Sequence, residues 1–307
     1  MAADPRGRRR LLVGGLALTA VAACGHKQSY TPPRLSDPAE PLPPLADRIG
    51  LLEKRDNAFV GLYGLNLGSN ATVAHRDNDM FAMCSTFKAY LAARVLQKAQ
   101  RGELVMTDTL YVDPAELQPN SPISEPKAGG RLALDELCRA VLQRSDNTAA
   151  NMLLGAIGGP PAITEFARSI GDERTRLDRW EIELNSALPG DPRDTTTPHA
   201  FGGGIRAILT GDVLDEAHRR QLEDWMRGNL TSRMRAGLPP GWTSADKTGS
   251  GDFASTNDIG IVFGSNGERI LVAVMTRTQS DDPKAPALGQ LIADVTTLAL
   301  PTLRGLA

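Results

Sequence analysis

Ser85 and Lys88 are the residues whose types and spacing point most directly to chemistry in this chain. They stand at the start of a run, 86–100, in which apolar side chains recur at helical spacing from Phe87 to Ala99. Because side chains three residues apart on a helix lie on the same side, the hydroxyl and the amine can meet. A serine becomes an effective nucleophile when a neighbouring base takes its proton, and a lysine can be that base when burial lowers its pKa. Alone, the pair is a weak signal, because surface pairing also produces it.

Two further polar clusters fall at the ends of predicted elements. Residues 145–147, Ser-Asp-Asn, separate two amphipathic helical patterns, and all three residue types are also preferred as helix caps. Residues 247–250, Lys-Thr-Gly-Ser, end a predicted strand, where a cation, two hydroxyls and a glycine let a backbone approach an acidic ligand. Taken singly, a helix cap and an edge turn explain these clusters equally well.

A long charged segment, 172–198, carries no regular pattern. Loops of this length in compact domains are usually functional or disordered. Trp180 and Leu184 stand among its charges and indicate a loop folded back onto the body. Arg179 and Asp194 are predicted to clamp the loop as an ion pair.

The remaining patterns predict strands at both ends of the folded body and helices between them. This order favours one sheet built from both chain ends, with a helical domain inserted, over an alternating fold. The α/β domain is predicted at 45–77 and 227–307, and the helical domain, with the charged loop, at 78–226. A Gly-Gly-Gly segment at 202–204 lacks the Lys-Ser/Thr of a phosphate loop and predicts loose helix packing. Helices are predicted at 45–55, 134–144, 149–157, 163–170, 200–209, 214–227 and 288–295, and strands at 59–67, 72–76, 243–249, 257–264 and 269–277.

Composition excludes several function classes. The chain has 307 residues and a formal net charge of −2, which argues against nucleic acid as the main partner, because phosphate binding requires a basic face. Its four histidines show no metal-ligand spacing, so we expect no metal and no cofactor. Cys84 and Cys138 fall on apolar positions and are expected to be free, buried thiols rather than a disulfide.

The N-terminus has the features of an export signal. Arginines within 6–10 precede an apolar run, 11–23, that is too short to span a membrane as a mature helix. The four residues ending in Cys24 resemble a bacterial lipobox, and residues 7–12 resemble, less specifically, a twin-arginine motif. An ordinary cleaved signal with an incidental Cys24 is the alternative. We expect a mature protein acylated at Cys24 on the outer face of the cytoplasmic membrane, in part released, with 25–44 as a proline-rich tether.

Together, S-x-x-K, S-D-N, a loop glutamate and K-T-G follow one another in a set order that resembles class A β-lactamases. The resemblance runs from about Leu45 to the C-terminus, and the stretch RLDRWEIELN followed by DPRDTTTP is its most specific part. It implies an α/β fold of the α+β type: an antiparallel five-stranded sheet flanked by helices, with an inserted all-α domain. It also implies a monomer that hydrolyses penicillins and cephalosporins and confers β-lactam resistance.

The resemblance implies a role for each catalytic residue. Ser85 would open the β-lactam ring and become acylated, with the backbone N–H groups of Ser85 and Ser250 as the oxyanion hole. Lys88, or Glu181 through a water, would remove the serine proton, and the resemblance leaves this choice open. Ser145, with Lys247 nearby, would relay a proton to the leaving nitrogen.

Further residues are implied in binding and positioning. Glu181 and Asn185 would hold the hydrolytic water, Asn147 would contact the acyl side-chain amide, and Arg179 with Asp194 would shape the loop. The groups implied in binding the substrate carboxylate are Lys247, Thr248 and Ser250, next to Gly249.

The chain departs from the common family pattern at several positions. Thr256 stands where many members have an arginine, and Arg233 occupies the place from which some relatives supply a substitute guanidinium. Ile182 replaces the usual proline after Glu181, which leaves open whether that peptide bond is cis. Asn120 replaces an aromatic residue that often flanks the site, so substrate stacking there should be weaker.

The cysteines also bear on the expected activity. Ala92 stands where many relatives have a partner for Cys138. Cys84 lacks a cysteine at the Gly251 position, a pairing seen in several carbapenem-hydrolysing members, so carbapenemase activity is not favoured.

Two other functions compete. A penicillin-binding D,D-peptidase shares S-x-x-K and K-T-G but has no need of a base such as Glu181 to hydrolyse the acyl-serine quickly. A solute-binding lipoprotein would account for Cys24 but needs no nucleophile.

Overall fold

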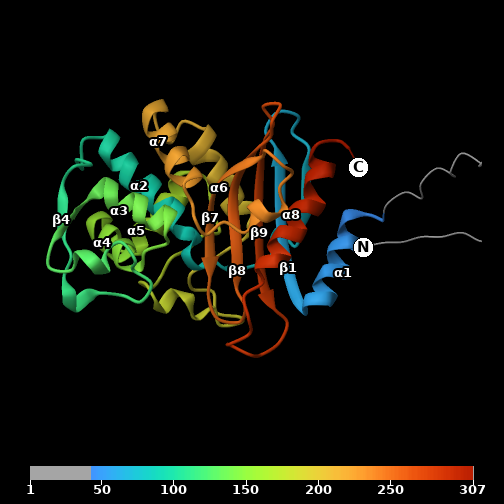
Figure 1. Cartoon of the computed structure of the whole chain (residues 1–307), viewed down its shortest axis with the longest axis horizontal. Helices are drawn as coiled ribbons and strands as arrows, with labels where there is room; N and C mark the ends of the chain where they lie inside the picture. The colour runs from blue at the N-terminus through green and yellow to red at the C-terminus, as the bar shows by residue number, and fades with distance from the viewer. Residues whose placement is uncertain (1–42, 307) are drawn as a thin grey trace, which may run out of the picture. The chain divides into compact units, whose positions relative to one another are not determined.

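The computed structural model describes residues 43–306, and Figure 1 shows how their helices and strands are arranged. The predicted signal ending at Cys24, and the predicted tether apart from Pro43 and Pro44, lie outside the described residues. Each described helix is too short or too polar to cross a lipid bilayer.

An antiparallel sheet of five strands, in the order β2-β1-β9-β8-β7, forms the centre of the fold. Residues 270–275 of the central strand are fully buried, because helices cover both faces of the sheet. The predicted fold class is confirmed: the two ends of the chain contribute strands to one sheet. The strands are β1 (Ala58–Asn66), β2 (Thr72–His75), β7 (Thr243–Ser250), β8 (Thr256–Phe263) and β9 (Arg269–Thr278).

One face of the sheet is covered by the first and last helices, α1 (Leu45–Asp56) and α8 (Gly289–Leu303). These two helices lie together in Figure 1. Their apolar side chains share a buried cluster with alternate residues of the strands, among them Ile49, Val272 and Leu291. This layer fixes the sheet from the side away from the helical region.

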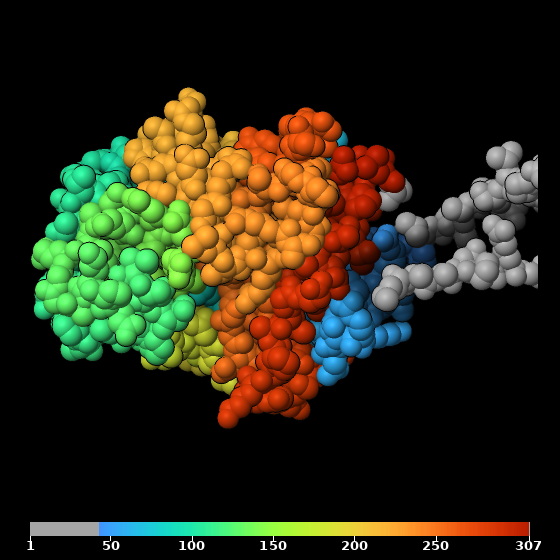
Figure 2. Space-filling view, in the orientation of Figure 1, coloured from blue at the N-terminus to red at the C-terminus, as the bar shows by residue number. Residues whose placement is uncertain are grey.

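The other helices form the region between the two sheet segments of the chain. Its central helix, α2, packs against the other helices of the region, and most of its residues are therefore buried. In Figure 2 the green part of this region lies beside the orange segment that runs from α7 to β7. The helices are α2 (Lys88–Gln100), α3 (Leu134–Gln143), α4 (Asn147–Ile157), α5 (Pro161–Ser169), α6 (Pro198–Thr210) and α7 (Glu216–Arg227).

Two short ladders and five short 3₁₀ turns complete the fold. The ladder of β3 and β6 ties the segment before Ser85 to the end of the charged loop. The ladders are β3 (Phe81–Ala82) with β6 (Thr195–Thr196), and β4 (Thr109–Tyr111) with β5 (Arg131–Ala133); the turns are η1 (Cys84–Phe87), η2 (Pro114–Glu116), η3 (Glu125–Lys127), η4 (Glu183–Ser186) and η5 (Met234–Gly237).

The glycines of α6 correct one expectation. A Cβ on Gly204 would lie 1.6 Å from the Tyr90 hydroxyl, and one on Gly202 would lie 2.9 Å from a ring carbon of Tyr63. The prediction of loose helix packing is therefore wrong: two of the three glycines allow α6 to approach its neighbours closely. Only Gly203 faces open space.

Element boundaries differ slightly from the prediction around the site. Residues 84–87 form the tighter turn η1 and the regular helix begins at Lys88, so Ser85 precedes it. Asp146 is indeed a helix cap, since its carboxylate accepts the Ala149 amide at 2.8 Å. The cap interpretation of the S-D-N cluster is therefore confirmed for Asp146.

Candidate active site

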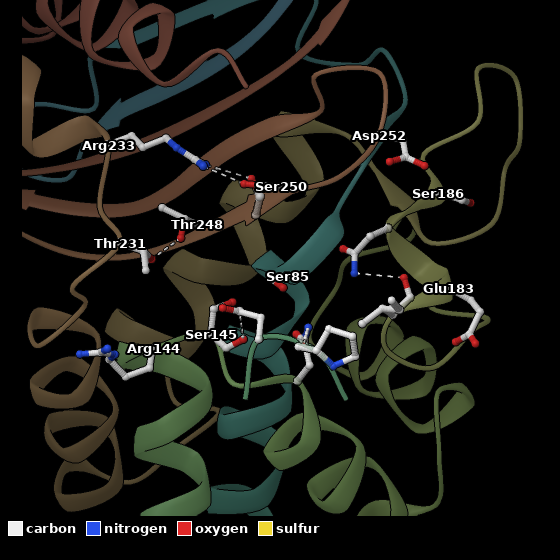
Figure 3. A pocket seen from close by; sticks show the side chains of 16 residues that line it. Ser85, Arg144, Ser145, Glu183, Ser186, Thr231, Arg233, Thr248, Ser250 and Asp252 are labelled. Carbon is white, nitrogen blue, oxygen red and sulfur yellow. Dashed lines mark hydrogen bonds between the residues drawn. The ribbon is translucent and has the colours of Figure 1, made fainter. Parts of the chain in front are cut away.

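A cleft of about 600 Å³ opens where the end of β7 meets the helical region. Figure 3 shows side chains from distant parts of the chain facing it, with Ser85 at its base, Ser145 beside it, and Arg233 and Ser250 on the opposite wall. The residues that line it are Ser85, Pro119, Asn120, Arg144, Ser145, Asn147, Ile182, Glu183, Asn185, Ser186, Thr231, Arg233, Thr248, Gly249, Ser250 and Asp252.

Ser85 lies on a turn that is held from several sides. The Met83 amide just before it donates to the carbonyl of Asp194 at 2.9 Å, and the Asn257 side chain donates to the Met83 carbonyl at 3.0 Å. A Cβ on Gly249 would lie 2.6 Å from that same carbonyl oxygen. Glycine is needed there because β7 passes directly against the turn that carries Ser85.

The Ser85 hydroxyl has a base on either side. Lys88 Nζ donates to Ser85 Oγ at 3.0 Å, and Ser85 Oγ donates to Glu181 Oε1 at 3.2 Å. Lys88 and Glu181 are themselves paired at 2.8 Å, and both side chains are completely buried. The three groups form a closed triangle although Glu181 is 96 residues away along the chain.

The environment of Lys88 suits a base. Burial lowers the pKa of Lys88, and the Glu181 carboxylate opposes this shift. Its ammonium also donates to Asn147 Oδ1 at 2.6 Å and to the Ser145 carbonyl at 2.9 Å, so each donor direction is occupied. A continuous hydrogen-bonded path therefore joins Ser85 Oγ, Lys88 Nζ and Glu181 Oε1.

Ser145 and Lys247 meet on the other side of Ser85. Lys247 Nζ donates to Ser145 Oγ at 3.1 Å. Burial, reinforced by the positive charge of Lys88, lowers the pKa of Lys247 to about 7. Lys247 is thus poised to lose its proton near neutral pH.

Glu181 is held at both its backbone and its carboxylate. Asn151 accepts the Glu181 amide at 3.0 Å and donates to its carbonyl at 2.9 Å, while Asn185 Nδ2 donates to Glu181 Oε2 at 2.5 Å. The Glu181–Ile182 peptide bond, which the sequence left open, is cis. Sequence reasoning missed Asn151, although its position one helical turn after Asn147 on α4 could have indicated a second inward amide.

The predicted clamp of the loop is present. Arg179 Nε donates to Asp194 Oδ2 at 2.5 Å, and the other oxygen of Asp194 accepts the backbone amides of Arg179 and Asp178 at 3.0 and 2.7 Å. Asp194 is fully buried, and a buried charge needs compensation, which these three donors provide.

Arg233 faces the end of β7, as Figure 3 shows. Its guanidinium donates to Ser250 Oγ at 2.7 Å and to the Gly249 carbonyl at 3.2 Å. Thr248 shares a hydrogen bond with Thr231, a cleft residue that belongs to none of the motifs. By contrast, the Thr256 hydroxyl points away from the cleft and bonds the Ala254 carbonyl.

Cys84 and Cys138 are both free and buried. Burial raises the pKa of each thiol well above its ordinary value, so neither is a reactive thiolate near neutral pH. A Cβ on Gly251 would lie 2.7 Å from Cys84 Sγ, which places the two positions side by side. Among residues 43–306, no group of three or more histidine, cysteine or acidic side chains is arranged to hold a metal ion.

The fold and this site define a serine hydrolase in which a lysine and a glutamate both lie within hydrogen-bond distance of the nucleophile. Comparison with known proteins gives the family: the profile described as "Beta-lactamase enzyme family" matches residues 44–300. The chain belongs to the β-lactamase enzyme family, within class A.

Individual relatives are similar over most of their length. Beta-lactamase FAR-1 of Nocardia farcinica is 40% identical over 255 residues, 82% of this chain and 81% of the relative. Beta-lactamase AST-1 of Nocardia asteroides is 38% identical over 308 residues, 96% of each chain. The carbapenem-hydrolyzing beta-lactamase KPC of Klebsiella oxytoca is 41% identical over 243 residues, 78% of this chain and 83% of the relative.

Solved structures agree with the fold. The β-lactamase of Desulfarculus baarsii superimposes with a TM-score of 0.81 at 38% identity and covers 86% of this chain and 97% of its own. A mutant of the class A β-lactamase of the last common ancestor of Gram-negative bacteria gives a TM-score of 0.80 at 44% identity, covering 85% of this chain and 99% of its own.

Proposed function

We propose that the protein hydrolyses the amide bond of the β-lactam ring in penicillins and cephalosporins, through an acyl-enzyme at Ser85, and so confers resistance to these drugs. The observation that carries this function is the buried Glu181 carboxylate 3.2 Å from Ser85 Oγ. A fixed base at this place serves the release of an acyl-serine as well as its formation.

In the acylation step, Ser85 Oγ attacks the lactam carbonyl and gives its proton to the Lys88–Glu181 pair. Because the two groups are coupled at 2.8 Å, they act as one base rather than as alternatives. The backbone N–H groups of Ser85 and Ser250 stabilise the oxyanion, an effect of about 3–4 kcal/mol per donor in other enzymes. Ser145 passes a proton, received through Lys247 or Lys88, to the leaving nitrogen.

In the deacylation step, Glu181 and Asn185 orient a water that attacks the ester at Ser85. Glu181 takes a proton from this water, and the tetrahedral intermediate collapses to free Ser85 and the ring-opened acid. Asn151 holds the backbone of Glu181 through one donated and one accepted hydrogen bond, and the Asn185 amide holds its carboxylate in place during this step.

The substrate carboxylate binds at the end of β7, to Arg233 and Lys247 with the hydroxyls of Thr248 and Ser250. Arg233→Ala should raise KM for a penicillin roughly 10- to 100-fold with little change in kcat, because a charge-assisted hydrogen bond is lost. The exposed Arg206→Ala on α6 is the matched control. An unchanged KM in Arg233→Ala would contradict this assignment.

Steady-state and burst kinetics with nitrocefin test the function directly. We expect many turnovers per enzyme and a burst no larger than the enzyme concentration, both abolished in Ser85→Ala. Stable stoichiometric acylation would instead identify a penicillin-binding D,D-peptidase. A panel of penicillins, cephalosporins and one carbapenem then defines the spectrum.

The proposal extends to the mature form, which we take to be a monomer anchored by a lipid on Cys24 at the outer face of the cytoplasmic membrane. It rests on the basic, apolar and lipobox-like order of residues 6–24. Mass spectrometry of the N-terminal peptide from membranes should show an acylated cysteine, lost in Cys24→Ala. Light scattering on the released domain should give the mass of one chain.

A further inference from the structure

Two acidic side chains, Asp246 and Asp258, are completely buried side by side under the carboxylate-binding end of the cleft. They come from adjacent strands: Asp246 pairs with Gly260 on β8, and Asp258 pairs with Thr248 on β7. This register puts both carboxyl groups, and Thr248, on one face of the sheet. A Cβ on Gly260 would lie 2.8 Å from that of Asp246, so glycine makes room for the pair.

The hydrogen-bond partners of Asp246 are those of an ionised carboxylate. One oxygen accepts the Ser244 hydroxyl and lies 3.3 Å from Arg235 Nη2, and the other accepts Asn229 Nδ2 at 2.6 Å. All of its close partners are donors, and one of them carries a positive charge.

The partners of Asp258 differ between its two oxygens. Oδ2 accepts the backbone amides of Arg233 and Met234 at 2.7 and 2.8 Å. Oδ1 is buried and has no donor among the described residues, although the side chain lies within hydrogen-bond reach of Asp246. A buried carboxylate oxygen without a donor destabilises the folded state, and two adjacent buried negative charges destabilise it further.

We propose that Asp258 carries a proton on Oδ1 and donates it to Asp246, and that this acid pair positions the groups that bind the substrate carboxylate. A proton at this place gives the orphaned oxygen a partner and leaves one negative charge on the pair. Burial and the charge of Asp246 both raise the pKa of Asp258, in agreement with this arrangement.

The pair connects to both sides of the carboxylate site. Asp258 holds the backbone of Arg233 directly. Asp246 holds Asn229, whose side-chain oxygen accepts the Thr231 hydroxyl at 2.7 Å, and Thr231 in turn bonds Thr248. A shift of either carboxyl group, or a change in the protonation of the pair, would therefore displace the Arg233 guanidinium and Thr248 together.

The charges around the pair explain why a single negative charge suits it. Three cationic side chains lie near it: Arg233 and Arg235 from the η5 segment, and Lys247, which comes from β7 but points to the opposite face of the sheet. With one proton on the pair, the two carboxyl groups and the three cations together keep a net positive charge, which attracts an anionic substrate. A second negative charge would weaken that attraction and raise the pKa of Lys247.

This inference rests on the proposed function, but its first test does not need a substrate. Infrared spectra of the wild type near pH 7 should contain the C=O stretch of a protonated carboxyl, and Asp258→Asn should lack it. An Asp258→Asn spectrum without this loss would overturn the proposal, even in a protein that hydrolyses no β-lactam. Asp281→Asn, an exposed carboxylate, is the matched control and should keep the band.

Kinetics separate positioning from a merely structural role. In the wild type, kcat/KM should fall at alkaline pH as Lys247 loses its proton, and we call this fall the alkaline limb. Asp258→Asn replaces a neutral acid by a neutral amide that can make the same hydrogen bonds, so the alkaline limb of this variant should lie at the same pH as in the wild type. Asp246→Asn removes the one negative charge and should move that limb to lower pH, because the pKa of Lys247 falls. If Asp258→Asn moved the limb as Asp246→Asn does, Asp258 would be ionised and the proposal would fail.

Asp258→Ala removes the hydrogen bonds to both partners. It should raise KM for a carboxylate-bearing penicillin about tenfold or more and change kcat less. A KM equal to that of the wild type would also overturn the positioning role. Should Asp258→Ala fail to fold, the infrared spectrum and pH profile of Asp258→Asn still decide the question.

Discussion

Glu181 is the residue on which the distinction between acylation and turnover depends. Glu181→Ala should still form an acyl-enzyme at Ser85 but release it slowly, with kcat lower by roughly 10²–10⁴-fold, the usual contribution of a general base. Mass spectrometry after mixing with a penicillin should show a persistent adduct. Glu165→Ala, an exposed glutamate on α5, should turn over normally. Full turnover by Glu181→Ala would refute the mechanism.

Lys247 should set the alkaline limit of activity. Its pKa of about 7 means that the free enzyme has a charged ammonium below this pH and a neutral amine above it. Since the charged form attracts the substrate carboxylate, kcat/KM should fall as the pH rises through that range. Lys247→Arg keeps its charge and should move the limb to higher pH, whatever its maximal rate. The exposed Lys284→Arg should have the profile of the wild type, and an unmoved limb in Lys247→Arg would assign it to another group.

At the scale of elements, the site depends on segments that pass unusually close to one another. β7 can pass the Ser85 turn because residue 249 is glycine, and α6 can approach α2 because residue 204 is glycine. The Glu181 loop lies in place through Arg179–Asp194 and Asn151 rather than through regular secondary structure.

The glycines of α6 offer a matched pair of substitutions. Gly204→Ala places a methyl group 1.6 Å from the Tyr90 hydroxyl and should lower the free energy of unfolding by about 1–3 kcal/mol or more, since overpacking forces neighbours to shift. Gly203→Ala, on the exposed side of the same helix, should raise it by about 0.5–1 kcal/mol through helix propensity. Urea unfolding of both variants measures the difference. Equal effects would mean that the α6–α2 contact is looser than described.

At the scale of the whole molecule, the catalytic group forms because contacts hold the sheet against the helical region. Asn257 on β8 makes two of these contacts: its side-chain amide donates to the carbonyls of Ala82 and Met83 at 2.9 and 3.0 Å. These bonds fix the segment that leads into Ser85.

Asn257→Ala should lower both stability and activity. Loss of two hydrogen bonds, each contributing about 1 kcal/mol, corresponds to a fall in Tm of roughly 4–8 °C for a domain of this size. Because the Ser85 turn loses its anchor, kcat should fall as well. Calorimetry and nitrocefin kinetics test both effects, with Asn266→Ala in the exposed β8–β9 turn as control. A fall in Tm without any change in kcat would confine Asn257 to stability.

The sequence by itself determined the elements, the fold class and the residue types of the site. Helical and strand periods depend on neighbours a few positions apart, and these patterns placed seven of the helices and the five strands of the central sheet within a few residues. The two short ladders, β3 with β6 and β4 with β5, were not predicted, and α8 continues to Leu303, past the predicted end at 295. The family motifs pointed to Ser85, Lys88, Ser145, Glu181 and Lys247, which the structure joins into one hydrogen-bonded group at the base of the cleft.

Only the tertiary structure decided which side chains meet and in what charge state. Thr231 and the pair Asp246–Asp258 carry no local signal, since their partners come from other elements and depend on strand register and loop packing. The same holds for Lys247: its sequence context predicts an ordinary cation, but complete burial beside Lys88 lowers its pKa to about 7. Burial is a property of the assembled fold, and so are the protonation states it sets.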